Sequence, residues 1–189
     1  MPNWCSNSIT ITGPVDKIRD LYDNHVIQDA DDETGLLDGM YPMPKHLHET
    51  VSPSENGEDW YNWRVNNWST KWEVSSEGLE FSDNGDGTAM ITGWFDSAWA
   101  PPIGAYEHFT EQNPDCSVSA SYYEPGMDFG GFWSTEHGDE YFEDLDARLK
   151  EPVESWDERF AAFEAEYDLL SEEWRFEDEE EDMVLDDEA

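Results

Sequence analysis

Residues 8–12 alternate hydroxyl and aliphatic side chains, and this alternation constrains the fold more than any other local pattern. A period of two places the aliphatic side chains on one face of a strand and the polar ones on the other. Gly13 and Pro14 end the strand, and Pro14 also suits the first turn of a helix. Apolar residues then recur at helical spacing from Val15 to Val26. The sequence therefore predicts a strand followed directly by a helix.

A hairpin and a second helix are expected in the middle of the chain. Residues 79–81 and 88–95 are strand-like and flank a turn rich in Gly, Asn and Asp, which predicts a β-hairpin. A helix is expected over residues 103–112, because a Pro pair opens this segment and Asn113-Pro114 stops it.

Two further strands are expected, one over residues 117–123 and a short one over residues 128–133. The complete order is then strand, helix, two strands, helix, strand. This is the order of a ferredoxin-like fold, in which two split βαβ units form one antiparallel sheet. We therefore expect an α+β fold of this type, with helices on one face of the sheet.

The acidic residues are concentrated in the last part of the chain. Residues 136–189 carry 24 acidic and four basic residues, against 23 and five in residues 1–135. Within the acidic part, apolar residues recur at alternating spacings of three and four, which predicts one helix over residues 152–175, roughly 36 Å long. Its stripe fits a helix packed on the rest of the protein, or a coiled coil with a second chain. The stripe consists of Val153, Trp156, Phe160, Phe163, Tyr167, Leu170 and Trp174.

These patterns divide the chain into three parts. We expect a ferredoxin-like domain over residues 1–135 and, packed on it, an acidic amphipathic helical extension over residues 136–176. Residues 177–189 are expected to form an acidic tail.

The charge of the chain limits its partners. It has 47 Asp and Glu against nine Lys and Arg, a formal net charge of -38. Such a chain repels the phosphates of nucleic acids and the surfaces of anionic membranes. It attracts a basic protein or a cation, and its excess of acidic residues also fits adaptation to high salt. We therefore expect a basic protein partner, with no direct binding of nucleic acid or membrane.

The sequence also indicates a compartment. Its first residues lack the basic and apolar regions of a secretory signal, and no run approaches the roughly 20 apolar residues that span a bilayer. Cys5 and Cys116 are far apart and form no CxxC motif, which is typical of two reduced thiols. We expect a cytoplasmic protein, acting in the cytoplasm of a host cell.

Three segments that contain tryptophan, residues 1–7, 60–72 and 95–102, are unusual in composition. With residues 40–44 and 122–126 they resemble the Api92-like family, whose module is also called the YubB ferredoxin-like domain and occurs on phages, plasmids and genomic islands. The resemblance covers about residues 1–135. It implies the ferredoxin-like fold and a phage or mobile-element origin, and it implies no activity and no site residues. Within the central segment, Ser69 departs from the family pattern, which has a glycine there.

The segment 60–72 is the strongest candidate for a small-ligand pocket. Its four tryptophans lie at spacings of 3, 5 and 4, close to one helical face, with Arg64 and Lys71 among them. The pattern fits a core helix whose cations stack on aromatic rings. It also fits an aromatic pocket with a cationic handle for a small anion or an exposed base. The pocket residues would be Trp60, Trp63, Arg64, Trp68, Lys71, Trp72 and Trp99.

Few residues suggest catalysis or metal binding. On a strand, His46 and His48 would share a face, and with Glu49 they could contribute to a metal site. The sequence contains no GxGxxG, Walker A, GxSxG or HExxH motif. We predict no catalytic residue, no metal and no cofactor.

Together these inferences lead to a working hypothesis about function. We expect a non-catalytic acidic interaction protein, monomeric or homodimeric, that binds and blocks a basic host protein, such as a nucleic-acid-binding defence or restriction enzyme. Its acidic surface would act as a DNA mimic or simply as an attractive surface. The alternative is a small-ligand-binding module or an enzyme that uses the 60–72 region, with acidity that reflects salt adaptation. The residues expected to attract the partner are Glu172, Glu173, Glu177, Asp178, Glu179, Glu180, Glu181 and Asp182.

Overall fold

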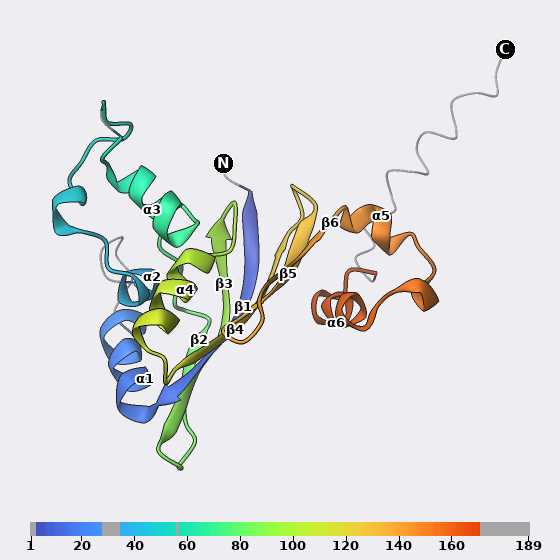
Figure 1. The fold of residues 1–189 in the computed structure, drawn as a ribbon, viewed down its shortest axis with the longest axis horizontal. Coiled ribbons are helices and arrows are strands. Elements are labelled where there is room, and N and C mark those ends of the chain that lie inside the picture. The colour runs from blue at the N-terminus through green and yellow to red at the C-terminus, as the bar shows by residue number, and fades with distance from the viewer. Residues whose placement is uncertain (1–2, 28–34, 56, 171–189) are drawn as a thin grey trace. The chain divides into compact units, whose positions relative to one another are not determined.

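The structure is a computed structural model that describes residues 3–27, 35–55 and 57–170 (Figure 1). The chain divides into two compact units, residues 1–143 and residues 144–189. The first unit contains a sheet with its helices, and the described part of the second contains short helices. No helix within the described ranges is long and apolar enough to cross a membrane.

The described part of the first unit forms a six-stranded antiparallel sheet in the order β2-β3-β1-β4-β5-β6 (Figure 1). The first strand of the chain, β1, therefore lies inside the sheet, between β3 and β4. The strands are β1 (Trp4–Pro14), β2 (Leu79–Asp83), β3 (Thr88–Ala98), β4 (Ser117–Glu124), β5 (Phe129–Ser134) and β6 (Gly138–Glu143).

Helices α1 to α4 lie together on one side of this sheet (Figure 1). Of the helical segments among the described residues of this unit, α4 connects β3 to β4 and the others occur between β1 and β2. Their bounds are α1 (Val15–Leu21), the π-helical turn η1 (Tyr22–Val26), α2 (Leu36–Met40), the 3₁₀ turn η2 (Lys45–Leu47), α3 (Trp60–Trp68) and α4 (Ile103–Gln112).

The core lies between the sheet and these helices. Along β1, buried and more exposed residues alternate, so that Ile9 and Ile11 enter the core while Thr10 and Thr12 lie on the opposite face. Asn7 also faces the core, where its amide donates hydrogen bonds to the Cys5 carbonyl (2.7 Å) and to the Ser97 hydroxyl (2.9 Å). These bonds satisfy the amide nitrogen of Asn7, whereas its buried Oδ1 has no hydrogen-bond partner in the described residues, so that they compensate part of the cost of burying this side chain.

The sequence predicts this part of the fold well. The expected α+β architecture with an antiparallel sheet is confirmed. The predicted hairpin forms as β2 and β3, and the predicted helix forms as α4 with the expected bounds. The predicted strands over residues 117–123 and 128–133 form as β4 and β5. Each of these elements has a local signal, either alternation or a pair of breakers.

Strand β6 was not expected, because residues 136–176 were assigned to a helical extension. β6 pairs along its whole length with β5, as the edge strand of the sheet. Its apolar residues, Tyr141 and Phe142, are adjacent in sequence and point to opposite faces, so that no alternation of polar and apolar residues marks the strand.

The prediction of one helix over residues 152–175 is wrong. The described part of the second unit has α5 (Leu145–Leu149), a 3₁₀ turn η3 (Val153–Ser155) and a shorter helix α6 (Glu158–Tyr167). The backbone of Trp156 is extended, and the Asp157 side chain accepts a hydrogen bond from Phe160 N (2.8 Å), which starts α6 after the break. The helix ends where Asp168 takes a left-handed conformation (φ 51°).

Part of the predicted apolar stripe still forms the interior of this second unit. Phe160 and Phe163 are fully buried, and Trp156 packs edge-on against Phe160 with ring centroids 5.1 Å apart. The Arg148 guanidinium lies over the Phe160 ring at 4.1 Å and pairs with Asp157. Val153, by contrast, is 57% exposed because the chain no longer continues as one helix.

Replacing Gly93 with alanine tests the packing of the hairpin. Gly93 has φ 149°, and a Cβ there would lie 1.8 Å from the Gly78 carbonyl oxygen. We expect Gly93→Ala to lower the free energy of unfolding by about 2 kcal/mol or more, measured by urea denaturation.

Gly85→Ala is the control, because it places a Cβ at a positive φ (76°) in open space. Its cost should be about 1 kcal/mol from backbone strain alone. Equal costs for the two variants would contradict the close approach at Gly93.

Candidate functional site

Helix α3 carries most of the tryptophan-rich segment, and the carboxylate of Asp59 fixes its start. Asp59 Oδ1 accepts from Asn62 N (2.9 Å), and Oδ2 accepts from Ser54 N (2.9 Å) and from the Ser54 hydroxyl (3.0 Å). These bonds hold the pKa of Asp59 well below its usual range, so that the N-cap stays ionised. The helix ends at Ser69, which has a left-handed backbone (φ 70°).

One half of the predicted pocket is core. Trp68 is fully buried and donates from Nε1 to the Tyr41 carbonyl (2.8 Å). Arg64 is only 4% exposed, with its guanidinium over the rings of Trp68 (4.8 Å) and Trp60 (5.5 Å). Trp60 and Trp63 are partly buried and pack against the hydrophobic core. These side chains therefore support the fold.

Glu73 connects this region to α2. Its carboxylate accepts from the backbone N–H groups of Leu37 (2.8 Å), Asp38 (2.9 Å) and Val74 (3.0 Å). Burial raises the pKa of Glu73 to about 7, although the three hydrogen bonds and the charge of Arg64 oppose the shift. Glu73 was not among the predicted residues, and no sequence signal marks an acid that caps a helix about 36 residues away.

The other half of the predicted pocket lies at the surface, around Lys71. Its Nζ lies over the rings of Trp72 (4.4 Å), Trp99 (5.4 Å) and Tyr61 (5.6 Å). Trp4 extends the group, with its ring centroid 5.9 Å from that of Trp72. We call these five residues the Lys71 cluster.

The Lys71 cluster includes two residues that the sequence-based pocket did not, Trp4 and Tyr61. The alternation of faces along a strand could have indicated Trp4, because Trp4 lies on the more exposed face of β1 together with Ser6 and Ser8. Tyr61 lies one residue after Trp60, on another face of α3, where its ring meets Trp99 edge-on at 6.5 Å.

Trp99 has an unusual backbone for a bulky side chain. Its φ is 70°, in the left-handed region that favours glycine. Its backbone N–H donates to the Asn3 carbonyl (3.0 Å), and the Ser97 hydroxyl donates to the Ala100 carbonyl (2.7 Å). The end of β3 thus holds an exposed indole against Lys71 in a conformation that costs free energy.

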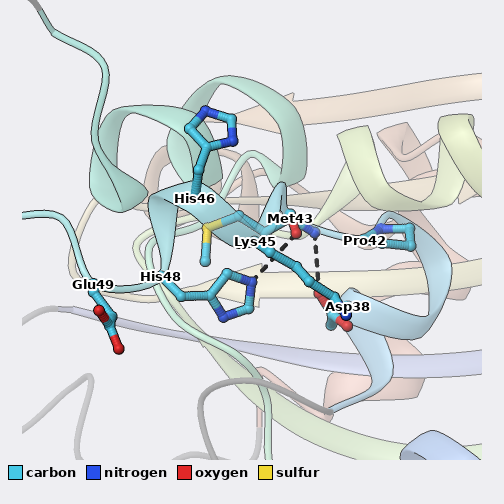
Figure 2. Close-up of a pocket in the computed structure, with 7 residues that line it drawn as sticks. All are labelled: Asp38, Pro42, Met43, Lys45, His46, His48 and Glu49. Carbon is cyan, nitrogen blue, oxygen red and sulfur yellow. Dashed lines mark hydrogen bonds between the residues drawn. The ribbon is translucent and has the colours of Figure 1, made fainter.

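The predicted pairing of His46 with His48 does not form. Residues 45–47 are a 3₁₀ turn and not a strand, and Figure 2 shows the two rings pointing in different directions, with Glu49 apart from both. His48 Nε2 lies 3.3 Å from the Met43 carbonyl oxygen. In the described part of the chain, no three His, Cys, Asp or Glu side chains form a group that could hold a metal ion.

Two open pockets flank this turn. The first has a volume of about 590 Å³ and is shown in Figure 2. Its lining residues are Asp38, Pro42, Met43, Lys45, His46, His48 and Glu49. The second, of about 310 Å³, follows the outer side of α3, with Asn62, Trp63, Asn66 and Asn67 in its wall. Charges of both signs line the first pocket, which gives it no preference for one kind of ion.

The cysteines are unsuited to nucleophilic chemistry. Both are buried, and neither forms a disulfide. Burial, with a smaller contribution from the Glu124 charge, raises the pKa of Cys5 to about 12. Because the thiolate is the reactive form, Cys5 stays inert at neutral pH.

Basic side chains of the described residues are engaged within the chain. Lys17 pairs with Asp115 (2.7 Å), and Arg19 pairs with Asp83 (3.4 Å) and lies over the Phe81 ring (4.5 Å). Arg64 and Lys71 lie against indole rings, and Arg148 against Phe160. Arg148 also pairs with Asp157, so that ring contacts and ion pairs occur together.

The acidic residues predicted to attract a partner, Glu172, Glu173 and Glu177 to Asp182, lie outside the described residues. Their role therefore stays a prediction.

Comparisons with protein-family models, with curated proteins and with solved structures give no match to this chain. The resemblance to the Api92-like family thus stays a prediction.

Replacing Glu73 with glutamine tests the buried carboxyl group. Because the pKa of Glu73 rises from 4.5 to about 7 on folding, the folded protein keeps a proton that the unfolded chain releases between these values. The stability that depends on this proton is present below pH 4.5 and is lost as the pH rises through 7. Between pH 4 and pH 8, the wild type should lose up to about 3 kcal/mol relative to Glu73→Gln.

Urea unfolding of both proteins at a series of pH values measures this difference, and the many other acids cancel in the comparison. Glu80→Gln is a control on the exposed edge of β2. A difference between wild type and Glu73→Gln that does not change with pH would show that Glu73 ionises normally.

Proposed function

We propose that this chain is a non-catalytic acidic interaction protein that binds and blocks a basic, nucleic-acid-binding host protein. The observation that carries the proposal is the excess of acidic residues, 47 Asp and Glu against nine Lys and Arg. Lys17 is paired with a carboxylate, while Arg64 and Lys71 are stacked on aromatic rings. With a net charge of -38, the surface then presents an excess of carboxylates to a partner.

The contacts of the cations do not change this excess of negative charge. A cation contributes its positive charge to the field of the protein whether it pairs with a carboxylate or stacks on a ring. The nine Lys and Arg can offset at most nine of the 47 acidic groups, so that an excess of carboxylates remains in either case. The resulting negative field would accelerate association with a basic protein and favour it over neutral ones.

The looser form of the proposal, an attractive acidic surface, is better supported than strict imitation of DNA. Helix α6 has three glutamates and one arginine in ten residues, or about one net charge per 7 Å of helix. Duplex DNA carries one charge per about 1.7 Å. A DNA mimic would therefore need acids from several elements arranged side by side.

We further propose that the first unit has a ferredoxin-like fold related to the Api92-like family, with a phage or mobile-element origin. The order β2-β3-β1-β4, with α1 after β1 and α4 between β3 and β4, supports the two split βαβ units. The left-handed backbone of Ser69 supports the family resemblance, because glycine suits such a position. A host cytoplasm and a monomeric or homodimeric state remain part of this proposal.

A pull-down from host lysate tests the function. The tagged full chain should capture one basic protein in stoichiometric amount at about 0.05 M salt. It should release that protein at about 0.5 M salt, where the Debye length is only a few Å, or when duplex DNA is added. The captured protein is then purified, and its dissociation constant is measured. Absence of a DNA-displaceable basic partner at both salt concentrations would contradict the proposal and favour the small-ligand alternative.

A variant with neutral side chains at residues 177–182 tests whether this segment attracts the basic partner. Replacing Glu and Asp at residues 177–182 with Gln and Asn should weaken the purified complex about tenfold or more, mainly by slower association, with unchanged thermal unfolding. The matched control neutralises six exposed acids elsewhere, Asp23, Glu55, Glu77, Glu80, Glu107 and Glu111. Equal effects of the two variants would indicate a diffuse field, and no effect of the first would exclude residues 177–182.

A further inference from the structure

The Lys71 cluster has the construction of a cation-binding site. Lys71 Nζ lies 4.4–5.6 Å from the centroids of the Trp72, Trp99 and Tyr61 rings, within the range of a cation–π interaction. Indole is the aromatic group that binds cations best, and two of these rings are indoles. The cluster therefore already holds an ammonium group, supplied by the chain itself.

The cluster is not required by the core. The hydrophobic core of the described residues includes Trp68 and has Trp60 and Trp63 packed against it, but it does not include Trp72 or Trp99. Trp4 is 49% exposed and Trp99 is 42% exposed. Exposed tryptophans that lie together are typical of binding surfaces, where Trp, Tyr and Arg supply most of the affinity.

The backbone at Trp99 supports the same interpretation. A left-handed conformation at a bulky residue costs about 1–3 kcal/mol, and strained residues of this kind are frequent at binding sites. The hydrogen bond from Trp99 N to the Asn3 carbonyl maintains the conformation. The left-handed backbone places the Trp99 indole near Lys71, and Trp99 is not part of the hydrophobic core.

Electrostatics decides between a cationic and an anionic ligand. The chain has a net charge of -38, so that an anion approaching the cluster is repelled at long range. Asp96, which accepts a hydrogen bond from Ser6 (2.9 Å), lies on the same side of the sheet as Trp4 and adds a nearby carboxylate. A cation is favoured by both the field and the rings.

We propose that the Lys71 cluster binds an arginine side chain of a basic protein, with Lys71 as an exchangeable occupant. A guanidinium stacks on indole better than an ammonium because it is planar and more weakly hydrated. The flexible Lys71 side chain can leave the rings and return to water at low cost. This inference rests on the proposed function, for which it names a specific contact within the interface.

Opposite effects of two substitutions test the proposal. The probes are a ten-residue arginine peptide and a ten-residue lysine peptide of equal charge, titrated into the full chain and followed by the indole N–H signals in NMR. Trp99→Ala should weaken binding of the arginine peptide about three- to tenfold. Lys71→Met should strengthen it about threefold, because the internal competitor is removed. The wild type should prefer the arginine peptide.

Matched controls separate the effects of these substitutions from the loss of any exposed indole and from a change in net charge. Trp94→Ala removes an equally exposed indole (49%) outside the cluster and should change affinity less than twofold. Lys45→Met removes one positive charge in the pocket of Figure 2 and corrects for the change in net charge. Circular dichroism melts verify folding, and Tyr61→Ala replaces Trp99→Ala if that variant unfolds.

The proposal is overturned if Lys71→Met acts no more strongly than Lys45→Met, or Trp99→Ala no more strongly than Trp94→Ala. It is also overturned if a mononucleotide, titrated as a small anion, binds the cluster through Lys71. Salt-sensitive peptide binding that all variants share would remove the cluster proposal and leave the acidic interaction surface intact. Absence of a DNA-displaceable host partner would remove the proposed function and leave a cation site to be explained.

Discussion

The stacking of Arg64 on Trp60 and Trp68 is the interaction on which the aromatic region depends. Arg64 is only 4% exposed, and the rings together with the nearby Glu73 carboxylate help to replace the water of its guanidinium. The contact turns one side of α3 toward the core. As a result Tyr61 lies on the outer part of the helix, where it meets Lys71 and Trp99. The orientation of α3 thus determines which aromatic side chains of the tryptophan-rich segment are buried and which are exposed.

A chain with a net charge of -38 has to fold against its own repulsion. The structure uses carboxylates as caps, such as Asp59 at α3, Asp157 at α6 and Glu73 at α2. Each of these groups accepts backbone N–H bonds that a helix end has to satisfy in any case. The few cations of the described residues are largely engaged within the chain, and the remaining surface carboxylates can act on a partner.

Much of the sheet could be predicted from sequence, because its signals are local. The alternation at residues 8–12 became the centre of β1, and the breakers around residues 103–112 marked α4. The sequence-based predictions are wrong where a helical or strand-like pattern of side chains is overridden by a helix cap or by a local turn. The spacing of apolar residues over 152–175 is helical, yet the Asp157 cap and the extended Trp156 interrupt the helix. His46 and His48 were paired on the assumption of a strand, and a 3₁₀ turn separates their rings.

By itself the sequence determined the charge of the surface, the α+β class and the location of the tryptophan-rich segment, because composition and short-range periodicity are properties of the chain alone. Only the tertiary structure decided which aromatic residues are core and which form the Lys71 cluster. That cluster joins Trp4 from β1, Tyr61 from α3 and Trp99 from the end of β3. Residues so far apart in sequence meet because β1 pairs with β3, and such long-range pairing leaves no periodic signal in the chain.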